Sequence, residues 1–400
     1  MNEPYDVIVI GARCAGSPVA MLLAQRGHRV LVVDRTALPA DTVSTHYLQQ
    51  YGLARLQSWG LLDEVLATGA TPITRMTISY DDAVIDGFAD PIDGITATLA
   101  PRRTALDPVL LRAAESAGAE VRLGATLREL IVEDGVVRGV RLQTADGALV
   151  EERARVVVGA DGSRSRVAEA VGAASYDVVE PSCFIYYSYW TGMDVQFHSR
   201  IGLGQQQVGA WPTNDGRTLV AVMRTRDRYA EFRGDVEKNF HEVLEQVVPD
   251  IAEQVRAGEQ AERFTGIQYP DNYYRVSAGP GWALVGDAGY HKDPFTGKGI
   301  SDAFVHAELL AGKIAEGLAG RPMGDVLAEY TTVRDASTQG AYRFTTMISD
   351  LDLSPELAAL FRAVSGNDPA TRQFLSMVGG GISGEEFFAP ANVGQIMAAV

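Results

Sequence analysis

The stretch Asp6-Val-Ile-Val-Ile10, followed by Gly11-Ala-Arg-Cys-Ala-Gly16, decides how this chain begins to fold. Its first five residues form the short apolar run of a buried parallel strand. A helical pattern follows the glycine turn and ends near Gly27, and a second strand over residues 29–33 runs into an acid. Strand, glycine turn, helix, strand and acid in this order are typical of a dinucleotide-binding unit.

The positions of this unit suit the pyrophosphate and the ribose of a dinucleotide. Gly11 permits a tight turn, and Gly16 lets the helix pack against the strand. The helix N-terminus at Ala15 presents free N–H groups and partial positive charge. Asp34 can accept hydrogen bonds from a ribose diol. The unit alone does not separate NAD from FAD, and a small-residue turn in an ordinary α/β unit is the alternative.

Arg13 and Cys14 occupy the middle of the turn. A glycine usually stands at the position of Arg13 and allows close backbone approach, so the arginine side chain is expected to cover the pyrophosphate instead. Cys14 is expected to be a small buried residue rather than a reactive thiol.

Two later segments also place a glycine turn after a buried strand. Residues 154–158 precede Gly159-Ala-Asp-Gly-Ser-Arg-Ser165. Residues 282–285 precede Gly286-Asp-Ala288, after which come Pro294, Gly297-Lys-Gly-Ile300 and a helical pattern. In isolation, Asp287 could simply cap the next helix.

Together the three segments resemble the FAD-dependent monooxygenases of the p-hydroxybenzoate hydroxylase family. Geranylgeranyl reductases and flavin-dependent halogenases belong to the same superfamily. The resemblance covers roughly the first 320 of the 400 residues. It implies an α/β fold: a three-layer, Rossmann-like FAD-binding domain with an inserted antiparallel-sheet substrate domain and a helical C-terminal tail.

The resemblance also implies which residues hold FAD. Asp287 would lie near the pyrophosphate and ribityl chain, and the helix after Gly297 would face the pyrimidine edge of the flavin. Arg103 would contact the ribityl or phosphate groups, with Arg102 as the alternative. The full predicted set is Gly11, Arg13, Ala15, Gly16, Asp34, Arg35, Thr45, Arg103, Leu127 at the adenine, Asp161 and Arg164 near the nicotinamide path, Gly286, Asp287, Pro294, Gly297, Lys298, Gly299 and Ile300.

The rhythm of the chain predicts three parts. Residues 1–72, 98–175 and 271–340 would form a discontinuous FAD-binding domain. Residues 73–97 and 176–270 show alternating or aromatic strand patterns and would form the substrate-binding sheet. The helical tail, 341–400, could close the pocket or mediate dimerisation.

His291 lies between Asp287 and Pro294 and is the first candidate for a general acid or base, with His46 second. The alternative is that His291 only orients its loop. Six His and two Cys form no metal-binding pattern, so no metal site is expected. Without a second glycine fingerprint, NADPH or NADH is expected to bind only transiently, as the reductant.

Bulk composition excludes several functions. The net charge of -16 argues against a nucleic-acid partner. No stretch of apolar residues is long enough for a membrane span, the N-terminus does not resemble a signal peptide, and two cysteines favour a reducing compartment. We expect a cytoplasmic monomer or homodimer that acts on a small molecule.

These features predict an FAD-dependent monooxygenase (hydroxylase) that uses NAD(P)H and O₂ on an aromatic or polyketide-like molecule. One alternative is a flavin-dependent C=C reductase of the geranylgeranyl reductase type, which an apolar tunnel would favour. A second is a flavin halogenase, although Gly209-Ala-Trp-Pro212 does not match the Trp-x-Trp-x-Ile-Pro segment of those enzymes. A third is a non-catalytic flavin-binding protein.

Overall fold

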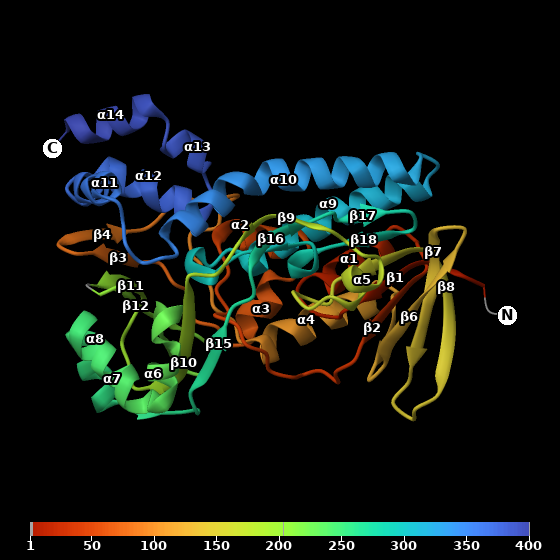
Figure 1. Ribbon diagram of the computed structural model, residues 1–400, viewed down its shortest axis with the longest axis horizontal. Helices are drawn as coiled ribbons and strands as arrows, with labels where there is room; N and C mark the ends of the chain where they lie inside the picture. Colours follow the sequence, from red (N-terminus) through yellow and green to blue (C-terminus); the bar gives the residue numbers. More distant parts are fainter. Residues whose placement is uncertain (1–2, 203, 400) are drawn as a thin grey trace.

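A largely parallel sheet forms the frame of one half of the molecule (Figure 1). The structure is a computed structural model that describes residues 3–202 and 204–399. The sheet has the order β17-β18-β8-β1-β2-β5, in which β18, β8, β1, β2 and β5 run parallel. The strands are β1 (Tyr5–Ile10), β2 (Val30–Asp34), β5 (Glu120–Leu123), β8 (Leu149–Gly159), β17 (Ala278–Gly279) and β18 (Trp282–Leu284).

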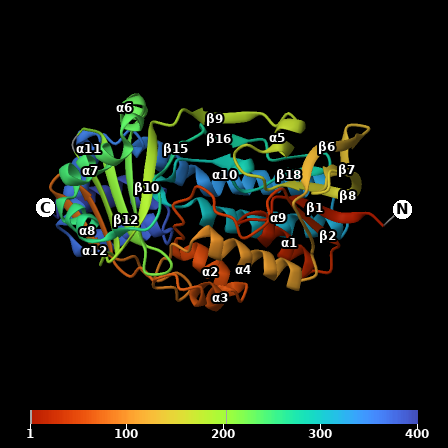
Figure 2. The ribbon, with the colours of Figure 1, turned by 90° about the horizontal axis from the view of Figure 1, so that it is seen from below.

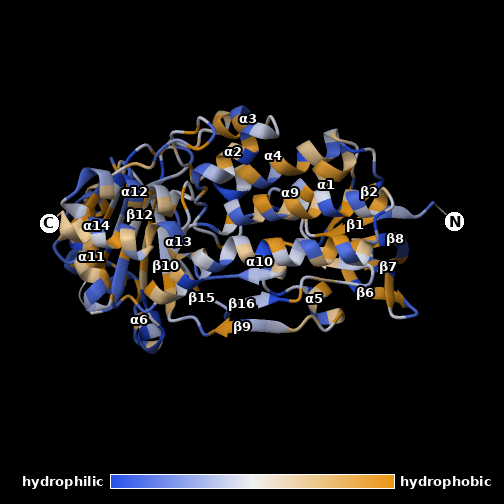
Figure 3. Cartoon of the chain, turned by 90° about the horizontal axis from the view of Figure 1, so that it is seen from above, coloured by the Kyte–Doolittle hydropathy of each residue, from blue (hydrophilic) through white to orange (hydrophobic). Residues whose placement is uncertain are grey.

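Alternate residues of these strands face two different layers because side chains alternate along a strand. Val7 and Val9 face a helical layer, whereas Ile8 and Ile10 face an antiparallel layer that continues from β8. Apolar residues are concentrated on α1 and β1 in Figure 3. The predicted three-layer domain is confirmed; its outer layers are α1 (Gly16–Ala24), α4 (Arg103–Ser116) and α9 (Gly299–Leu318) on one side, and β6 (Thr126–Glu133) and β7 (Val136–Gln143) on the other.

A second sheet lies at the opposite end of the molecule, where helices cover its outer face (Figure 2). Its order is β14-β10-β13-β12-β11-β3-β4, with β15 also paired to β10. The expectation of a wholly antiparallel sheet is corrected at one point, because β3 joins β11 in parallel from a distant part of the chain. The elements are β3 (Met76–Tyr80), β4 (Ala83–Gly87), β10 (Cys183–Thr191), β11 (Phe197–Gly202), β12 (Gln206–Pro212), β13 (Thr218–Thr225), β14 (Glu259–Gln260), β15 (Thr265–Gln268), α6 (Tyr229–Gly234), α7 (Val236–Val247) and α8 (Pro249–Ala257).

The C-terminal helices pack against the second sheet. The helix α10 (Met323–Ile348) runs along the molecule and is continuous across the boundary expected at residue 340 (Figure 1). Beyond it, the Ser354 hydroxyl accepts the Leu357 N–H and caps the next helix, and Phe387 is fully buried against the β4 side. The tail consists of α11 (Pro355–Ser365), α12 (Asp368–Gly379), α13 (Gly384–Phe387) and α14 (Pro390–Ala398).

The remaining elements pack on the first half or lie between the two halves. A three-stranded sheet, in the order β19-β16-β9, lies between them. Within the described residues, the helices are too short or too polar to cross a membrane. The connecting elements are α2 (Gln50–Ser58), α3 (Leu62–Ala67), α5 (Arg166–Ala170), β9 (Ser175–Val179), β16 (Asn272–Arg275) and β19 (Tyr290–His291).

Candidate active site

The turn between β1 and α1 has no room for side chains at its two glycines. Gly11 has φ +109°, and a Cβ there would lie 2.3 Å from the Ala160 carbonyl oxygen. A Cβ on Gly16 would lie 1.8 Å from the Gly11 oxygen. The Asp34 carboxylate accepts the Ala12 N–H at 2.9 Å, so this acid also holds the turn in place. Arg35 is exposed beside it.

Arg13 is anchored on α4. Its Nη1 lies 3.2 Å from Asp107 Oδ2, and Arg103 Nε donates to Oδ1 of the same carboxylate at 2.8 Å. Cys14 is buried, as expected, and its Sγ donates to Asp107 at 3.4 Å. Asp107 is fully buried. The role of Arg13 toward a pyrophosphate stays a prediction, whereas its structural partner is Asp107.

The structure excludes the alternative that Arg102 is a solvent-exposed charge. Its side chain is buried, donates to Asp41 Oδ2 at 2.8 Å and pairs with Glu262. Its guanidinium also lies 4.2 Å from the ring centroid of Tyr189. Arg102 therefore connects α4 to the second sheet, and the neighbouring Arg103 remains the better placed of the two arginines for a cofactor.

The third sequence motif packs directly on the first. Gly286 has φ +62°, and a Cβ there would lie 2.8 Å from the Cβ of Ala15. Asp287, the next residue, is exposed. At Gly299, where α9 begins, an added Cβ would meet no atom within 4 Å. Asp287 and the α9 N-terminus are thus open to solvent. Pro294, Gly297 and Ile300 are partly exposed nearby.

Charged groups are buried under the start of α9. Lys292 pairs with Asp302, which also accepts the Tyr51 hydroxyl at 2.5 Å. Lys298 lies over the Tyr51 ring, 5.3 Å from its centroid. Burial lowers the pKa of Lys298 to about 8. Lys298 can therefore gain or lose its charge near neutral pH.

Asp161 has a structural role at α5. Its Oδ2 accepts the N–H groups of Arg166 at 2.7 Å and Val167 at 3.4 Å. Burial raises the pKa of its carboxyl group. Arg164 is exposed and Leu127 is buried in β6. Their predicted contacts with nicotinamide and adenine stay predictions.

The two candidate histidines occupy different places. His46 is fully buried with φ +62°, and its Nε2 lies 2.6 Å from the Tyr189 hydroxyl. Burial, with the nearby charges of Arg103 and Arg102, lowers the pKa of His46 to about 3. It is thus a neutral imidazole at pH 7, and its Nδ1 has no partner among the described residues.

His291 lies in the small three-stranded sheet. Its Nδ1 is 3.0 Å from the Asp271 carbonyl oxygen, and its ring stacks on Tyr273 with centroids 5.7 Å apart. These contacts fit the alternative in which His291 orients its loop. Its catalytic role stays a prediction.

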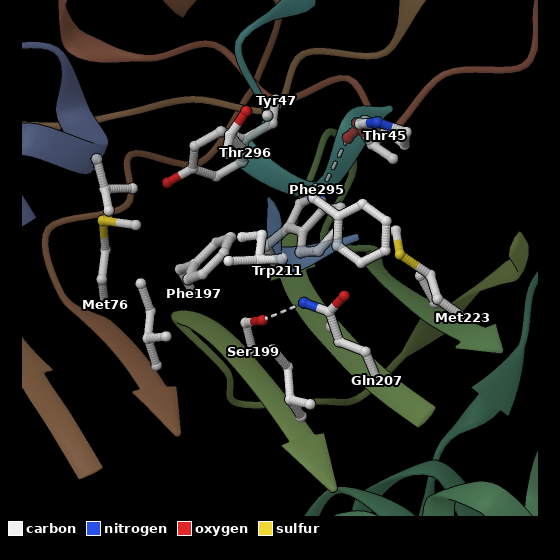
Figure 4. Close-up of a pocket in the computed structure, with 18 of the residues that line it drawn as sticks. Thr45, Tyr47, Met76, Phe197, Ser199, Gln207, Trp211, Met223, Phe295 and Thr296 are labelled. Atoms are coloured by element: carbon white, nitrogen blue, oxygen red, sulfur yellow. Dashed lines mark hydrogen bonds between the residues drawn. The ribbon is translucent and has the colours of Figure 1, made fainter. Parts of the chain in front are cut away.

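A cavity lies between the second sheet, the Pro294–Gly297 turn and the C-terminal helices (Figure 4). The residues that line it include no Asp, Glu, Lys, Arg or His. Phe197 and Trp211 stack there with ring centroids 5.6 Å apart, and Trp211 Nε1 donates to the Thr45 carbonyl at 3.0 Å. The tail contributes Phe361, Phe374 and Val378, so it closes the cavity.

Residues 4–345 match the family model described as FAD binding domain. The chain belongs to the FAD binding domain family. It is 29% identical over 330 residues to the digeranylgeranylglycerophospholipid reductase of Methanosarcina acetivorans. That match covers 79% of this chain and 75% of the reductase. It is 30% identical over 360 residues to reductase 2 of Methanopyrus kandleri, which covers 85% and 81%. The protein is therefore an FAD-dependent oxidoreductase.

Solved structures of flavoproteins share the fold of this family member. The flavin-dependent brominase Bmp2 is 18% identical with a TM-score of 0.85, and the match covers 99% of each chain. PqsL, a probable FAD-dependent monooxygenase from Pseudomonas aeruginosa, is 21% identical with a TM-score of 0.77, covering 87% of this chain and 96% of PqsL. These likenesses concern the fold.

The residues of this FAD-binding protein fit the cofactor. The α1 N-terminus would face a phosphate at the Gly11 turn, where the N–H groups of Gly11 and Ala12 are themselves bonded to Val33 and Asp34. The space around Gly299 leaves the α9 N-terminus open to an electron-rich ring. Arg103 is close enough to Asp287 for the two charges to interact. The predicted contacts of Gly11 and Arg103 with the pyrophosphate, and of Asp287 with the ribityl chain, stay predictions.

Sequence reasoning missed three features of this flavoprotein. Asp107 lies four residues after Arg103, a spacing that could have indicated their ion pair. Trp211 was noted only for its mismatch with a halogenase segment. The burial of Arg102 against Asp41 and Glu262 had no local signal, whereas closure of the pocket was one of the two roles expected for the tail.

Proposed function

We propose that this flavoprotein reduces carbon–carbon double bonds in an apolar, prenyl-type molecule, with NAD(P)H as the source of electrons. The observation that carries the proposal is the cavity, whose lining contains aromatic and aliphatic side chains and no charged one. Such a lining favours a hydrocarbon skeleton and disfavours a carboxylate or phosphate, because an unpaired buried charge is costly.

The relatives support the same choice. Relatives that match 75–81% of their own length are named digeranylgeranylglycerophospholipid reductases. The sequence features favour oxygenation, with an apolar tunnel as the feature that would favour a reductase. The cavity has that character, so the order of the two candidates is reversed.

Saturation of an alkene requires a hydride on one carbon and a proton on the other. A bound FAD, once reduced by NAD(P)H, would supply the hydride. The chain supplies the enclosure: Trp211, Phe197 and the tail residue Phe361 shield the reacting carbons from water. His46 lies outside the cavity lining and is neutral at pH 7, so it holds no proton ready for the substrate, and the proton would come from solvent.

The test uses the purified holoprotein, geranylgeraniol and NADPH without O₂. The expected product is 2 mass units heavier for each double bond reduced, as each alkene gains two hydrogens. A matched panel of phenols and polyketides is run in air and in the presence of bromide. Asp287→Ala, prepared in parallel, serves as the flavin-depleted control.

Three results would overturn the proposal. Product that gains one oxygen atom in air would identify a monooxygenase. Product that gains bromine would identify a halogenase. Flavin that NADPH and NADH never reduce, with any of these compounds present, would identify a non-catalytic flavin-binding protein.

A further inference from the structure

Two carboxamide side chains interrupt the apolar wall of the cavity. Gln207 projects from β12 on the face of the second sheet that also carries Trp211, and Gln49 stands just before α2. Gln207 is 9% exposed and Gln49 is 1% exposed. Figure 4 shows the Gln207 side chain among Ser199, Trp211 and Met223.

Both amides use their nitrogen and leave their oxygen unpaired. Gln207 Nε2 donates to Ser199 Oγ at 2.8 Å, and Gln49 Nε2 donates to the Thr296 carbonyl at 2.9 Å. Oε1 of each glutamine is buried and has no hydrogen-bond partner among the described residues. A buried acceptor without a donor costs free energy, so a ligand that donates a hydrogen bond to either oxygen would remove that cost.

Three other polar side chains in the lining already have hydrogen-bond partners within the protein. The Tyr47 hydroxyl bonds to Thr98 Oγ1 at 2.7 Å. Thr296 Oγ1 bonds to Thr345 Oγ1 at 3.0 Å, and the Trp211 indole donates to a backbone carbonyl. The two fully buried side-chain atoms of the lining that have no partner among the described residues, Oε1 of Gln207 and Oε1 of Gln49, are both acceptors, and the group that would complement them is a hydrogen-bond donor.

We propose that the cavity selects apolar molecules that carry a hydroxyl or N–H group, and that Gln207 Oε1 accepts the hydrogen bond from that group. This inference rests on the proposed function, which it deepens by naming the polar group of the substrate. A site that must bond a substrate hydroxyl rejects an analogue without the donor, because the buried protein acceptor would stay unpaired.

The experiment compares geraniol with geranyl methyl ether, which has the same carbon skeleton and no donor. Binding to the oxidised holoprotein is measured by calorimetry without NAD(P)H. The wild type is expected to bind the alcohol about tenfold more tightly than the ether. Gln207→Leu, which removes the acceptor and keeps a similar volume, is expected to bring that ratio close to one.

Two further variants make the result specific. Met223→Leu changes the lining beside Gln207 without changing its polarity, and it is expected to keep the preference for the alcohol. Gln207→Met repeats the test with a flexible side chain, should the leucine variant fold poorly. Equal binding of alcohol and ether by the wild type overturns the inference, as does an unchanged preference in a folded Gln207 variant.

The outcome is independent of turnover. A preference for the alcohol without alkene reduction would refute the proposed function and leave this inference standing. Alkene reduction with equal binding of the alcohol and the ether would support the proposed function and overturn this inference.

Discussion

The guanidinium of Arg13 lies 3.2 Å from the carboxylate of Asp107, a residue 94 positions further along the chain. Asp107 has no exposed surface, and it also holds Arg103 at 2.8 Å. One buried acid therefore fixes both the arginine in the glycine turn and the arginine assigned to FAD.

Replacing Asp107 by Asn should destabilise the protein and weaken flavin retention. The change removes the buried carboxylate that pairs with two partly buried guanidinium groups, which we expect to cost about 3–5 kcal/mol of unfolding free energy. Urea unfolding and the flavin-to-protein absorbance ratio would measure the two effects. Glu64→Gln, which disrupts the exposed pair with Arg112, is the control and should change stability by less than about 1 kcal/mol. Equal effects of the two variants would contradict this prediction.

Gly11→Ala should be far more harmful than Gly60→Ala. Both glycines have positive φ, +109° and +73°, so both substitutions introduce backbone strain of about 1 kcal/mol or more. Only at Gly11 would the new Cβ meet backbone atoms, at 2.3 Å from Ala160. Thermal unfolding of the two variants would reveal the difference. Similar melting temperatures would show that the turn can open without cost.

Asp287→Ala should release FAD from a folded protein. Asp287 is exposed, so its removal leaves no buried cavity, and secondary structure measured by circular dichroism should be unchanged. Retention of flavin through gel filtration should fall at least about tenfold, because a hydrogen bond to a charged group contributes about 1.5–3 kcal/mol. The control is Glu253→Ala, which removes an exposed acid of α8 outside the predicted FAD-binding residues. This variant should retain FAD. Full retention by Asp287→Ala would remove this residue from the site.

Stability should fall as the pH drops from 7 to 5. The pKa of His46 is lowered by burial to about 3, below the ordinary value of 6.5, so the unfolded chain binds more protons between these values. The stabilisation is present above pH 6.5 and is lost as the pH falls toward 3. His46 should account for about 2 kcal/mol of the loss between pH 7 and 5.

The check is urea unfolding of His46→Asn at both pH values. Asparagine tolerates the positive φ of this position and does not titrate. His306, whose pKa burial lowers to about 4, keeps its own contribution in that variant. The variant should therefore lose about 2 kcal/mol less than the wild type between the two pH values. Identical losses would mean that His46 takes up a proton in the folded protein as readily as in the unfolded chain, and that its pKa is not lowered by burial.

Local sequence was sufficient to locate three strands of the first domain, whereas its three-layer arrangement was expected from the family resemblance. The run before Gly11, the strand before Gly159 and the strand before Gly286 are all buried parallel strands, because each carries continuous apolar residues bounded by a glycine turn. The helical tail was also recognisable, since Ser354 and the proline after it mark a helix start by local chemistry.

What the sequence could not reveal depends on residues far apart in the chain. The parallel pairing of β3 with β11 depends on where a distant segment meets a sheet edge, which no local pattern records. The protonation state of His46 likewise could not be predicted, because its pKa is lowered chiefly by burial, which depends on the tertiary structure.

The sequence by itself determined the glycine turns, the apolar strands before them and the helix starts, since these are properties of consecutive residues. Only the tertiary structure decided the partner of Arg13 and the chemical character of the cavity. Asp107 reaches Arg13 through the packing of α4 on α1, and the apolar lining is assembled from the second sheet, the Pro294 turn and the tail. Contacts of this kind depend on which surfaces meet in space, and that information resides in packing rather than in local spacing.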